Sequence, residues 1–221
     1  MNTHNLKIYN TLSGKKEKFL PLKNKKVNLF VCGQTVYDFT HIGHAKTFIV
    51  FDSFAKYLKH IGFNVFYLQN ITDIDDKIIA RAREKGVLPK NLASVFEKEY
   101  LKAMKSLGIN SVTKYARATS HIKEIINQIE RLLKKGYAYR LEDGIYYDIS
   151  KFKNYGKLSS RTVLEAEDAV SRIDYSKNKK NRGDFCLWKF KQDIAEPSWP
   201  SPFGSPPTNF ALKTGSGKLK I

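Results

Sequence analysis

The alternation of apolar and polar residues in the first third of the chain predicts a strand, a helix and a second strand. Residues 27–32 form a short apolar run that predicts a buried strand, and residues 64–69 predict another. Between them, residues 45–61 predict a helix, with Gly62 as its carboxy-terminal cap. Its apolar residues recur at helical spacing, at Phe48, Phe51, Phe54, Ala55 and Leu58. Since the crossover of such a β-α-β unit is right-handed, an α/β fold with a parallel sheet is expected.

The rest of the chain predicts helices followed by short strands. Further helices are expected at residues 74–84, 92–107 and 121–135. The last is the clearest, because its Ile and Leu residues fall on one face and Gly136 follows it. A hairpin is expected from residues 137–139 and 145–149 around a turn at Asp143 and Gly144, and another strand at 184–190. Irregular structure is expected at 151–182, at 196–204 and from 205 onward.

Two unusual polar loops follow the first two predicted strands. Residues 32–40 come after the first strand, and residues 70–76 come after the second. Parallel strands end at the same edge of a sheet, and α/β proteins bind ligands at that edge. We therefore expect both loops to lie at one rim, although about 40 residues separate them in the sequence.

The entrance to the predicted helix carries two histidines with a glycine between them. His41 and His44 lie where a helix amino terminus offers unpaired N–H groups and partial positive charge, which suits a phosphate. Gly43 lacks a Cβ that would hold an adenosine away. Taken alone, the two histidines are equally compatible with exposed caps or a stray metal pair.

The cysteines and the acidic loop each allow a structural interpretation. A free cysteine such as Cys32 is usually a small buried hydrophobe, and Cys186, within an apolar strand, is read as core. Asp73 or Asp75, ahead of the helical residues 78–84, suits an amino-terminal cap. With Asp76 they also suggest a divalent cation, but the full calcium-loop pattern is missing.

Composition narrows the class of protein. The formal net charge of +18 is compatible with RNA as a partner, although lysines spread along the whole chain also fit a biased genome composition. Residues 177–182 form the one concentrated basic loop. Two cysteines are too few for a disulfide framework. No apolar run approaches the roughly 20 residues that a membrane span needs, and the first eight residues lack a signal-peptide core, so a cytoplasmic protein without a membrane partner is expected.

Several motifs together resemble the cysteinyl-tRNA synthetases, which are class I aminoacyl-tRNA synthetases. The resemblance rests on Cys-Gly-Gln-Thr-Val-Tyr-Asp at 32–38, His-Ile-Gly-His at 41–44 and Asn-Ile-Thr-Asp-Ile-Asp-Asp at 70–76. It continues through the segments at 6–12, 117–119, 155–159 and 196–199. The fold it implies is the first half of a Rossmann-type nucleotide-binding domain, at 1–115, with an α+β connective insertion at 116–204.

The resemblance implies a cysteine–tRNA ligase that uses ATP, Mg²⁺ and zinc and acts on cysteine and its tRNA, as a monomer. It implies that His41, Gly43 and His44 are catalytic, that Cys32 is a zinc ligand and that Thr72 helps to hold cysteine. The remaining expected binding residues are Gly33, Gln34, Thr35, Tyr37, Asp38 and Thr40. Zinc binds thiolates more strongly than hydroxyl groups. A zinc ion with an open coordination position could therefore bind the sulfur of cysteine and discriminate against serine.

After Gly204 the resemblance ends, and residues 205–221 read as an unrelated tail. The remaining zinc ligands, the Lys-Met-Ser-Lys-Ser loop and the anticodon-binding domain of the family have no counterpart here. We therefore expect a truncated chain, from a frameshift or a premature stop, with weak or no cysteine activation. The alternatives are a non-catalytic basic fragment that binds RNA or nucleotide, and a relative that joins cysteine to an amino sugar.

Overall fold

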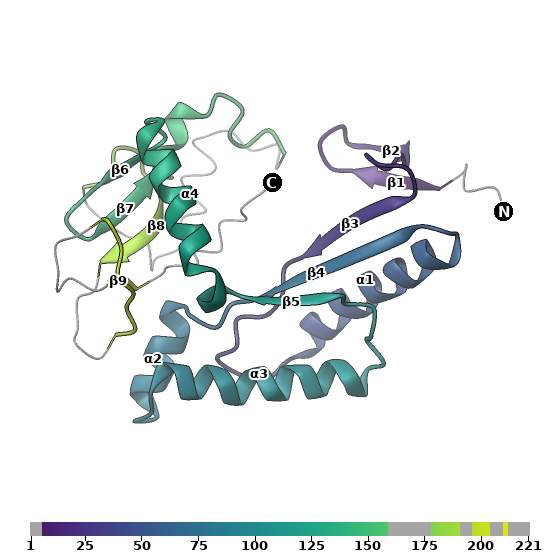
Figure 1. Cartoon of the computed structure of the whole chain (residues 1–221), viewed down its shortest axis with the longest axis horizontal. Helices are drawn as coiled ribbons and strands as arrows, with labels where there is room; N and C mark the ends of the chain where they lie inside the picture. Colours follow the sequence, from purple (N-terminus) through teal and green to yellow (C-terminus); the bar gives the residue numbers. More distant parts are fainter. Residues whose placement is uncertain (1–5, 159–177, 191–195, 204–209, 212–221) are drawn as a thin grey trace. The chain divides into compact units, whose positions relative to one another are not determined.

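The computed structural model describes residues 6–158, 178–190, 196–203 and 210–211. The chain divides into two compact units, Met1–Ser120 and His121–Ile221, and each is considered by itself (Figure 1). Most of the predicted loop at 151–182 and of the tail after 204 lies outside the described residues. The division at 115 and 204 stays a prediction.

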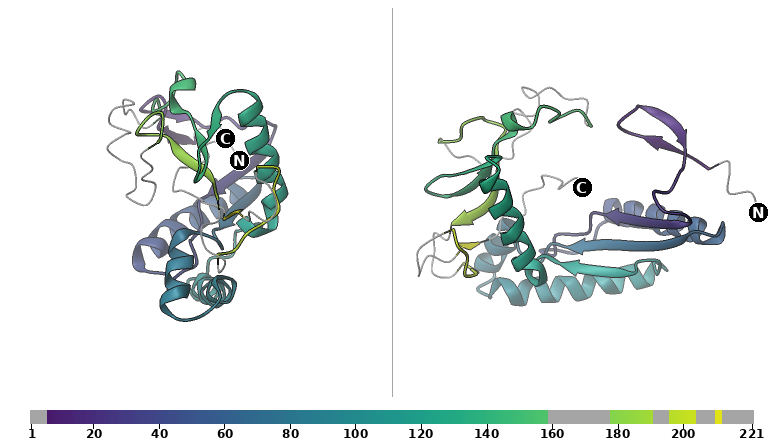
Figure 2. Two further views of the ribbon diagram at one scale, coloured as in Figure 1. Left: turned by 90° about the vertical axis from the view of Figure 1, so that its left-hand side faces the viewer. Right: turned by 45° about the horizontal axis from the view of Figure 1, so that its top comes forward.

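The first unit is built on a three-stranded parallel sheet in the order β3-β4-β5. Its strands are β3 (Lys26–Val31), β4 (Asn64–Ile71) and β5 (Lys114–Arg117). Burial alternates along β4: Val65 and Tyr67 are buried, whereas Phe66 is 42% exposed. The buried face packs on α1 (Ile42–His60) and α3 (Pro89–Ser106), which lie on the same side of the sheet (Figure 2).

The predicted β-α-β unit is confirmed, with differences at its ends. The helix α1 begins at Ile42, three residues before the predicted start, because His41 caps it. The helix α2 (Asp76–Glu84) begins two residues after the predicted start, because the Asp75 carboxylate accepts the Lys77 N–H. The strand β4 runs two residues beyond the prediction, and β5 was not predicted.

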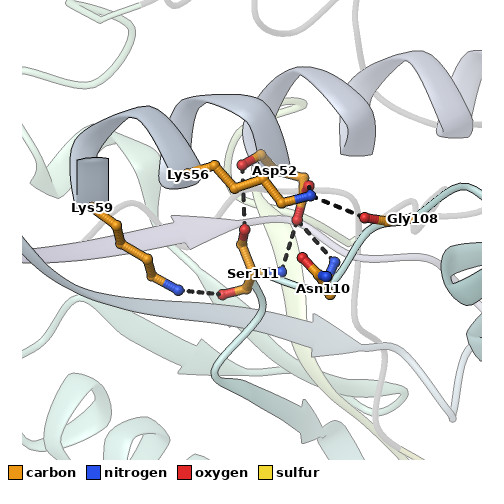
Figure 3. Close-up of polar contacts among 6 residues, drawn as sticks. All are labelled: Asp52, Lys56, Lys59, Gly108, Asn110 and Ser111. Atoms are coloured by element: carbon orange, nitrogen blue, oxygen red, sulfur yellow. Dashed lines mark hydrogen bonds and ion pairs between the residues drawn. The ribbon is translucent and has the colours of Figure 1, made fainter. Parts of the chain in front are cut away.

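A buried carboxylate joins α1 to the loop before β5. Asp52 is 3% exposed and accepts hydrogen bonds from the backbone N–H groups of Asn110, at 3.0 Å, and Ser111, at 2.8 Å (Figure 3). Its second oxygen lies 2.6 Å from the Lys56 ammonium, which also donates to the Gly108 carbonyl. Burial alone would raise the pKa of Asp52, but the hydrogen bonds from Lys56, Ser111 and Asn110 together lower it.

An antiparallel hairpin precedes the parallel sheet. It consists of β1 (Lys7–Asn10) and β2 (Lys15–Lys18), neither of which was predicted. Its base is fixed where the Phe19 N–H donates to the Leu6 carbonyl, at 2.8 Å. The Phe19 ring packs edge-on against Phe63, the residue before β4, at 5.6 Å between centroids.

The second unit pairs one helix with an antiparallel sheet. The helix α4 (Ile122–Lys134) is followed by strands in the order β6-β7-β8-β9, at Ala138–Arg140, Gly144–Tyr147, Phe185–Phe190 and Phe210–Ala211. The predicted hairpin is therefore confirmed, and so is the buried position of Cys186, which is 3% exposed. The expectation of little order after 205 is wrong at Phe210–Ala211, because these residues pair with β8.

Short 3-10 helices occur at Ala118–His121 and Ile149–Lys151. None of the helices in the described part of the chain is both long and apolar enough to cross a membrane.

Candidate nucleotide and amino-acid site

The two polar loops are joined at the carboxyl edge of the parallel sheet, as expected from their positions after β3 and β4. Thr35 and Thr72 form a parallel bridge. The Thr72 N–H donates to the Gln34 carbonyl at 3.1 Å, and the Val36 N–H donates to the Thr72 carbonyl at 3.2 Å. The bridge lies four residues beyond Val31 and three beyond Gln69, the last pair of β3 and β4, so the register shifts by one residue between the strands and the loops. The parallel strands therefore lead directly into the two paired motifs.

Close contact between the loops requires glycine at position 33. A Cβ on Gly33 would lie 1.8 Å from the Asn70 carbonyl oxygen, far inside van der Waals contact. The Gly33 N–H donates to the Asn70 side-chain oxygen at 2.9 Å, and the Asn70 amide donates to the Thr72 hydroxyl at 3.2 Å. Asn70 therefore fixes both the residue after Cys32 and the side chain of Thr72.

Side-chain hydrogen bonds within residues 33–40 fix the shape of the first loop. Gln34 is 3% exposed; its amide donates to the Asp38 carbonyl at 2.9 Å and its oxygen accepts from the Thr40 hydroxyl at 2.7 Å. The Asp38 carboxylate lies 3.3 Å from the Arg81 guanidinium of α2. The Gln34 and Thr40 side chains are thus engaged within the loop.

The two histidines form a reciprocal cap at the start of α1. His41 Nδ1 accepts the Gly43 N–H at 3.1 Å, and His44 Nδ1 accepts the His41 N–H at 3.5 Å. The rings stack at 3.8 Å between centroids. Because each Nδ1 accepts a hydrogen bond, the proton of each neutral ring belongs on Nε2, which leaves an Nε2–H donor on both. Burial and the neighbouring His41 charge lower the pKa of His44, which favours its neutral form at pH 7.

The glycine between the histidines allows their rings to stack. A Cβ on Gly43 would lie 2.9 Å from His41 Cε1. The first turn of α1 contains no acidic residue, so its N–H groups and the positive end of the helix dipole keep their attraction for an anion.

Cys32 is exposed at the end of β3, with one thiol at the rim. In the part of the chain that the structure describes, no group of three or more His, Cys, Asp or Glu side chains is arranged to hold a metal ion. The acidic loop is engaged in protein contacts: the Asp73 carboxylate accepts both the N–H and the hydroxyl of Thr119, and Asp75 caps α2. These contacts favour the cap interpretation of the acidic loop over a cation site.

Comparison with known proteins decides the family. The family model for the class I tRNA synthetase (C) catalytic domain matches residues 18–208. The chain belongs to this family. It is 52% identical over 197 residues to the cysteine–tRNA ligase of Thermoplasma volcanium, covering 89% of this chain and 43% of that protein. It is 50% identical over 201 residues to that of Thermococcus kodakarensis, covering 90% and 41%. The chain thus spans less than half the length of these relatives.

Membership of the class I (C) synthetase family agrees with the observed half of a Rossmann-like α/β fold. The motif residues Cys32, Gly33, Thr35, Thr72, His41 and His44 lie in the two joined loops and the adjoining helix start. Sequence reasoning assigned no role to Asn70, Arg81 or Thr119, which hold these loops in place. The segment Arg-Ala-Thr at 117–119 is part of the family resemblance, and this was the one signal in the sequence that pointed to Thr119.

Proposed function

We propose that this chain supplies the ATP- and cysteine-binding rim of a cysteine–tRNA ligase. The observation that carries the proposal is the Thr35–Thr72 bridge, which joins the two family loops beside the capped histidines of α1. The family membership and the similarity to cysteine–tRNA ligases support the same reaction.

Activation of cysteine joins its carboxylate oxygen to the α-phosphorus of ATP and breaks the bond to pyrophosphate. Negative charge gathers on the phosphate oxygens, and preorganised donors that face this charge lower the barrier. The Nε2–H groups of His41 and His44 and the positive end of the α1 dipole are such donors and charges. Gly43 keeps the two rings stacked in this arrangement. Mg²⁺ accompanies the ATP phosphates.

The remaining rim residues position the substrates. Gly33, Thr35 and Tyr37 present the first loop to the nucleotide, and Gln34, Asp38 and Thr40 hold that loop in shape. Thr72, aligned by Asn70, contacts the amino acid. The activated cysteine then passes to a cysteine-accepting tRNA.

The described residues do not form a complete zinc site. Even a catalytic zinc needs three protein ligands, and Cys32 belongs to no group of three or more His, Cys, Asp or Glu side chains among the described residues. No step of the reaction above depends on zinc.

A second candidate is a non-catalytic fragment that binds nucleotide. It is favoured because no group of three or more His, Cys, Asp or Glu side chains among the described residues is arranged to hold zinc.

ATP binding tests the proposal without requiring turnover. Calorimetric titration of the 221-residue chain should show ATP binding that weakens about tenfold or more in the His41→Ala and His44→Ala variants. His60→Ala is the matched control, because His60 is exposed in the last turn of the same helix. Equal affinity in all four proteins would refute the proposed rim.

Cysteine-dependent ATP–pyrophosphate exchange then separates the two candidates. Exchange above that of the His41→Ala variant identifies a catalyst. ATP binding without exchange, in a sample whose circular dichroism shows a folded protein, identifies the non-catalytic fragment.

A further inference from the structure

One face of the β1–β2 hairpin gathers three lysines and a tyrosine. Side chains alternate between the faces of a strand, so Lys7 and Tyr9 share a face, and their cross-strand partners Lys18 and Lys16 lie on it too. All four residues are exposed, and the Tyr9 side chain is 59% exposed. We call these four residues the lysine face.

The charges of the lysine face are not balanced within the hairpin. Lys7 and Lys18 stand directly opposite each other, and like charges in this position destabilise a strand pair. The only acid of the two strands, Glu17, belongs to the other face, where it accepts a hydrogen bond from Asn10. Such an arrangement is stabilised by an anion that contacts several lysines at once.

The hairpin presents this face on a fixed support. Its turn is closed by the Gly14 N–H, which donates to the Asn10 carbonyl at 2.8 Å, with Gly14 at a φ of 70°. Its base is anchored by Phe19 against Phe63, in the apolar cluster that α1 and β4 share. Pre-positioned lysines lose less conformational freedom on binding than free ones.

The lysine face is too far from the histidines to serve the same small ligand. The Phe63 anchor directly precedes β4, so the hairpin base lies at the amino end of the sheet, whereas the rim lies at the carboxyl end. The six residues of β3 between these ends span about 20 Å at ~3.3 Å per residue. Neither ATP nor cysteine bridges that distance.

We propose that the lysine face binds the phosphate backbone of RNA, with Tyr9 stacking on an exposed base or ribose. Lysines that neutralise adjacent phosphates and an exposed aromatic ring for stacking are the two elements of sequence-tolerant RNA binding. That the RNA is a cysteine-accepting tRNA rests on the proposed function. A polynucleotide is also the one substrate of that reaction that is long enough to reach both the rim and the hairpin.

The test measures binding of a cysteine-accepting tRNA transcript to the full chain by fluorescence anisotropy over a series of salt concentrations. The first variant carries Lys7→Gln, Lys16→Gln and Lys18→Gln. The matched control carries Lys90→Gln, Lys98→Gln and Lys105→Gln, which removes the same charge from exposed positions of α3. Circular dichroism confirms that both fold.

The hairpin variant should bind at least tenfold more weakly at 0.1 M salt, and the slope of log K against log salt should fall by about 2–3. The α3 control should stay within about threefold of the unmodified chain. Tyr9→Ala should weaken binding about tenfold and Tyr9→Phe should not. Equal losses in both triple variants would mean that net charge alone acts, and would overturn the proposal.

Two further arms separate this inference from its alternatives. Calorimetric ATP binding of the unmodified chain and of the hairpin variant is recorded separately, so that failure of the ATP site and failure of the lysine face are distinguished. Vesicles containing phosphatidylserine serve as a competing polyanion. Hairpin-dependent binding to vesicles without hairpin-dependent binding to RNA would overturn the proposal.

Discussion

Replacing Asp52 tests how α1, and with it the histidine cap, is held in the first unit. In Asp52→Ala the buried Ser111 N–H loses its acceptor, which costs about 1–3 kcal/mol. The Asn110 N–H belongs to an exposed residue, so water replaces part of that hydrogen bond. The Lys56 ammonium adds at most about 1 kcal/mol, because half of its side chain is exposed. The total loss should be about 2–4 kcal/mol.

Two milder variants separate the contributions of this cluster. Asp52→Asn keeps an acceptor oxygen but loses the charge, so it should cost about 1–2 kcal/mol. Lys56→Gln should cost at most about 1 kcal/mol. Urea unfolding followed by circular dichroism ranks the variants by their free energy of unfolding. Amide hydrogen exchange at Ser111 measures the local loss of protection at the hydrogen bond itself.

The stability difference should also depend on pH. The folded-state pKa of Asp52 lies below its ordinary value, so the charge stabilises the fold above about pH 4. That contribution should disappear as the pH falls through the lowered pKa, and Asp52→Asn should then approach the unmodified chain. A smaller loss in Asp52→Ala than in Lys56→Gln, or unchanged exchange at Ser111, would refute this reasoning.

Three further predictions concern the rim. Gly33→Ala should destabilise the chain by about 1–3 kcal/mol or prevent folding, because its Cβ would overlap the Asn70 carbonyl; a urea titration measures the loss. Gly62→Ala is the control, because Gly62 has open space around it and a φ of 94°, so its loss of stability measures backbone strain without steric overlap. Gly43→Ala should leave stability within about 1 kcal/mol but weaken calorimetric ATP binding, since its Cβ displaces the His41 ring; unchanged binding would contradict this role. A thiol reagent should modify Cys32 rapidly and Cys186 only after unfolding, and Cys32→Ala should abolish the fast phase; two fast thiols would contradict the buried position of Cys186.

The sequence predicted those parts of the fold that follow from apolar periodicity. The strands β3 and β4 and the helix α1 have regular apolar spacing, and the rule for parallel strands then placed both loops at one rim. The four residues of β5 are too few to show a period. The lysine-rich β2 was missed because it exposes every residue, so it has no apolar face to detect.

In the candidate site, residue types were predicted but their contacts were not. Helix-start chemistry indicated the position of His41 and His44, yet their stacking depends on ring orientation. Arg81 meets Asp38 across 43 positions of the sequence, and Thr119 meets Asp73 across 46. Only the folded sheet brings such partners together, and for this reason Asn70, Arg81 and Thr119 went unassigned.

The most direct test of the central claim is a nitrogen-15 spectrum of the histidine side chains, recorded with and without ATP. Without ATP, His41 and His44 should be protonated on Nε2 when neutral, and His44 should titrate below its ordinary pKa. With ATP, the signals of His41 and His44 should shift while those of His60 and His121 stay in place. If all signals remain unchanged, or if those of His41, His44, His60 and His121 shift equally, an ATP site at the start of α1 is contradicted.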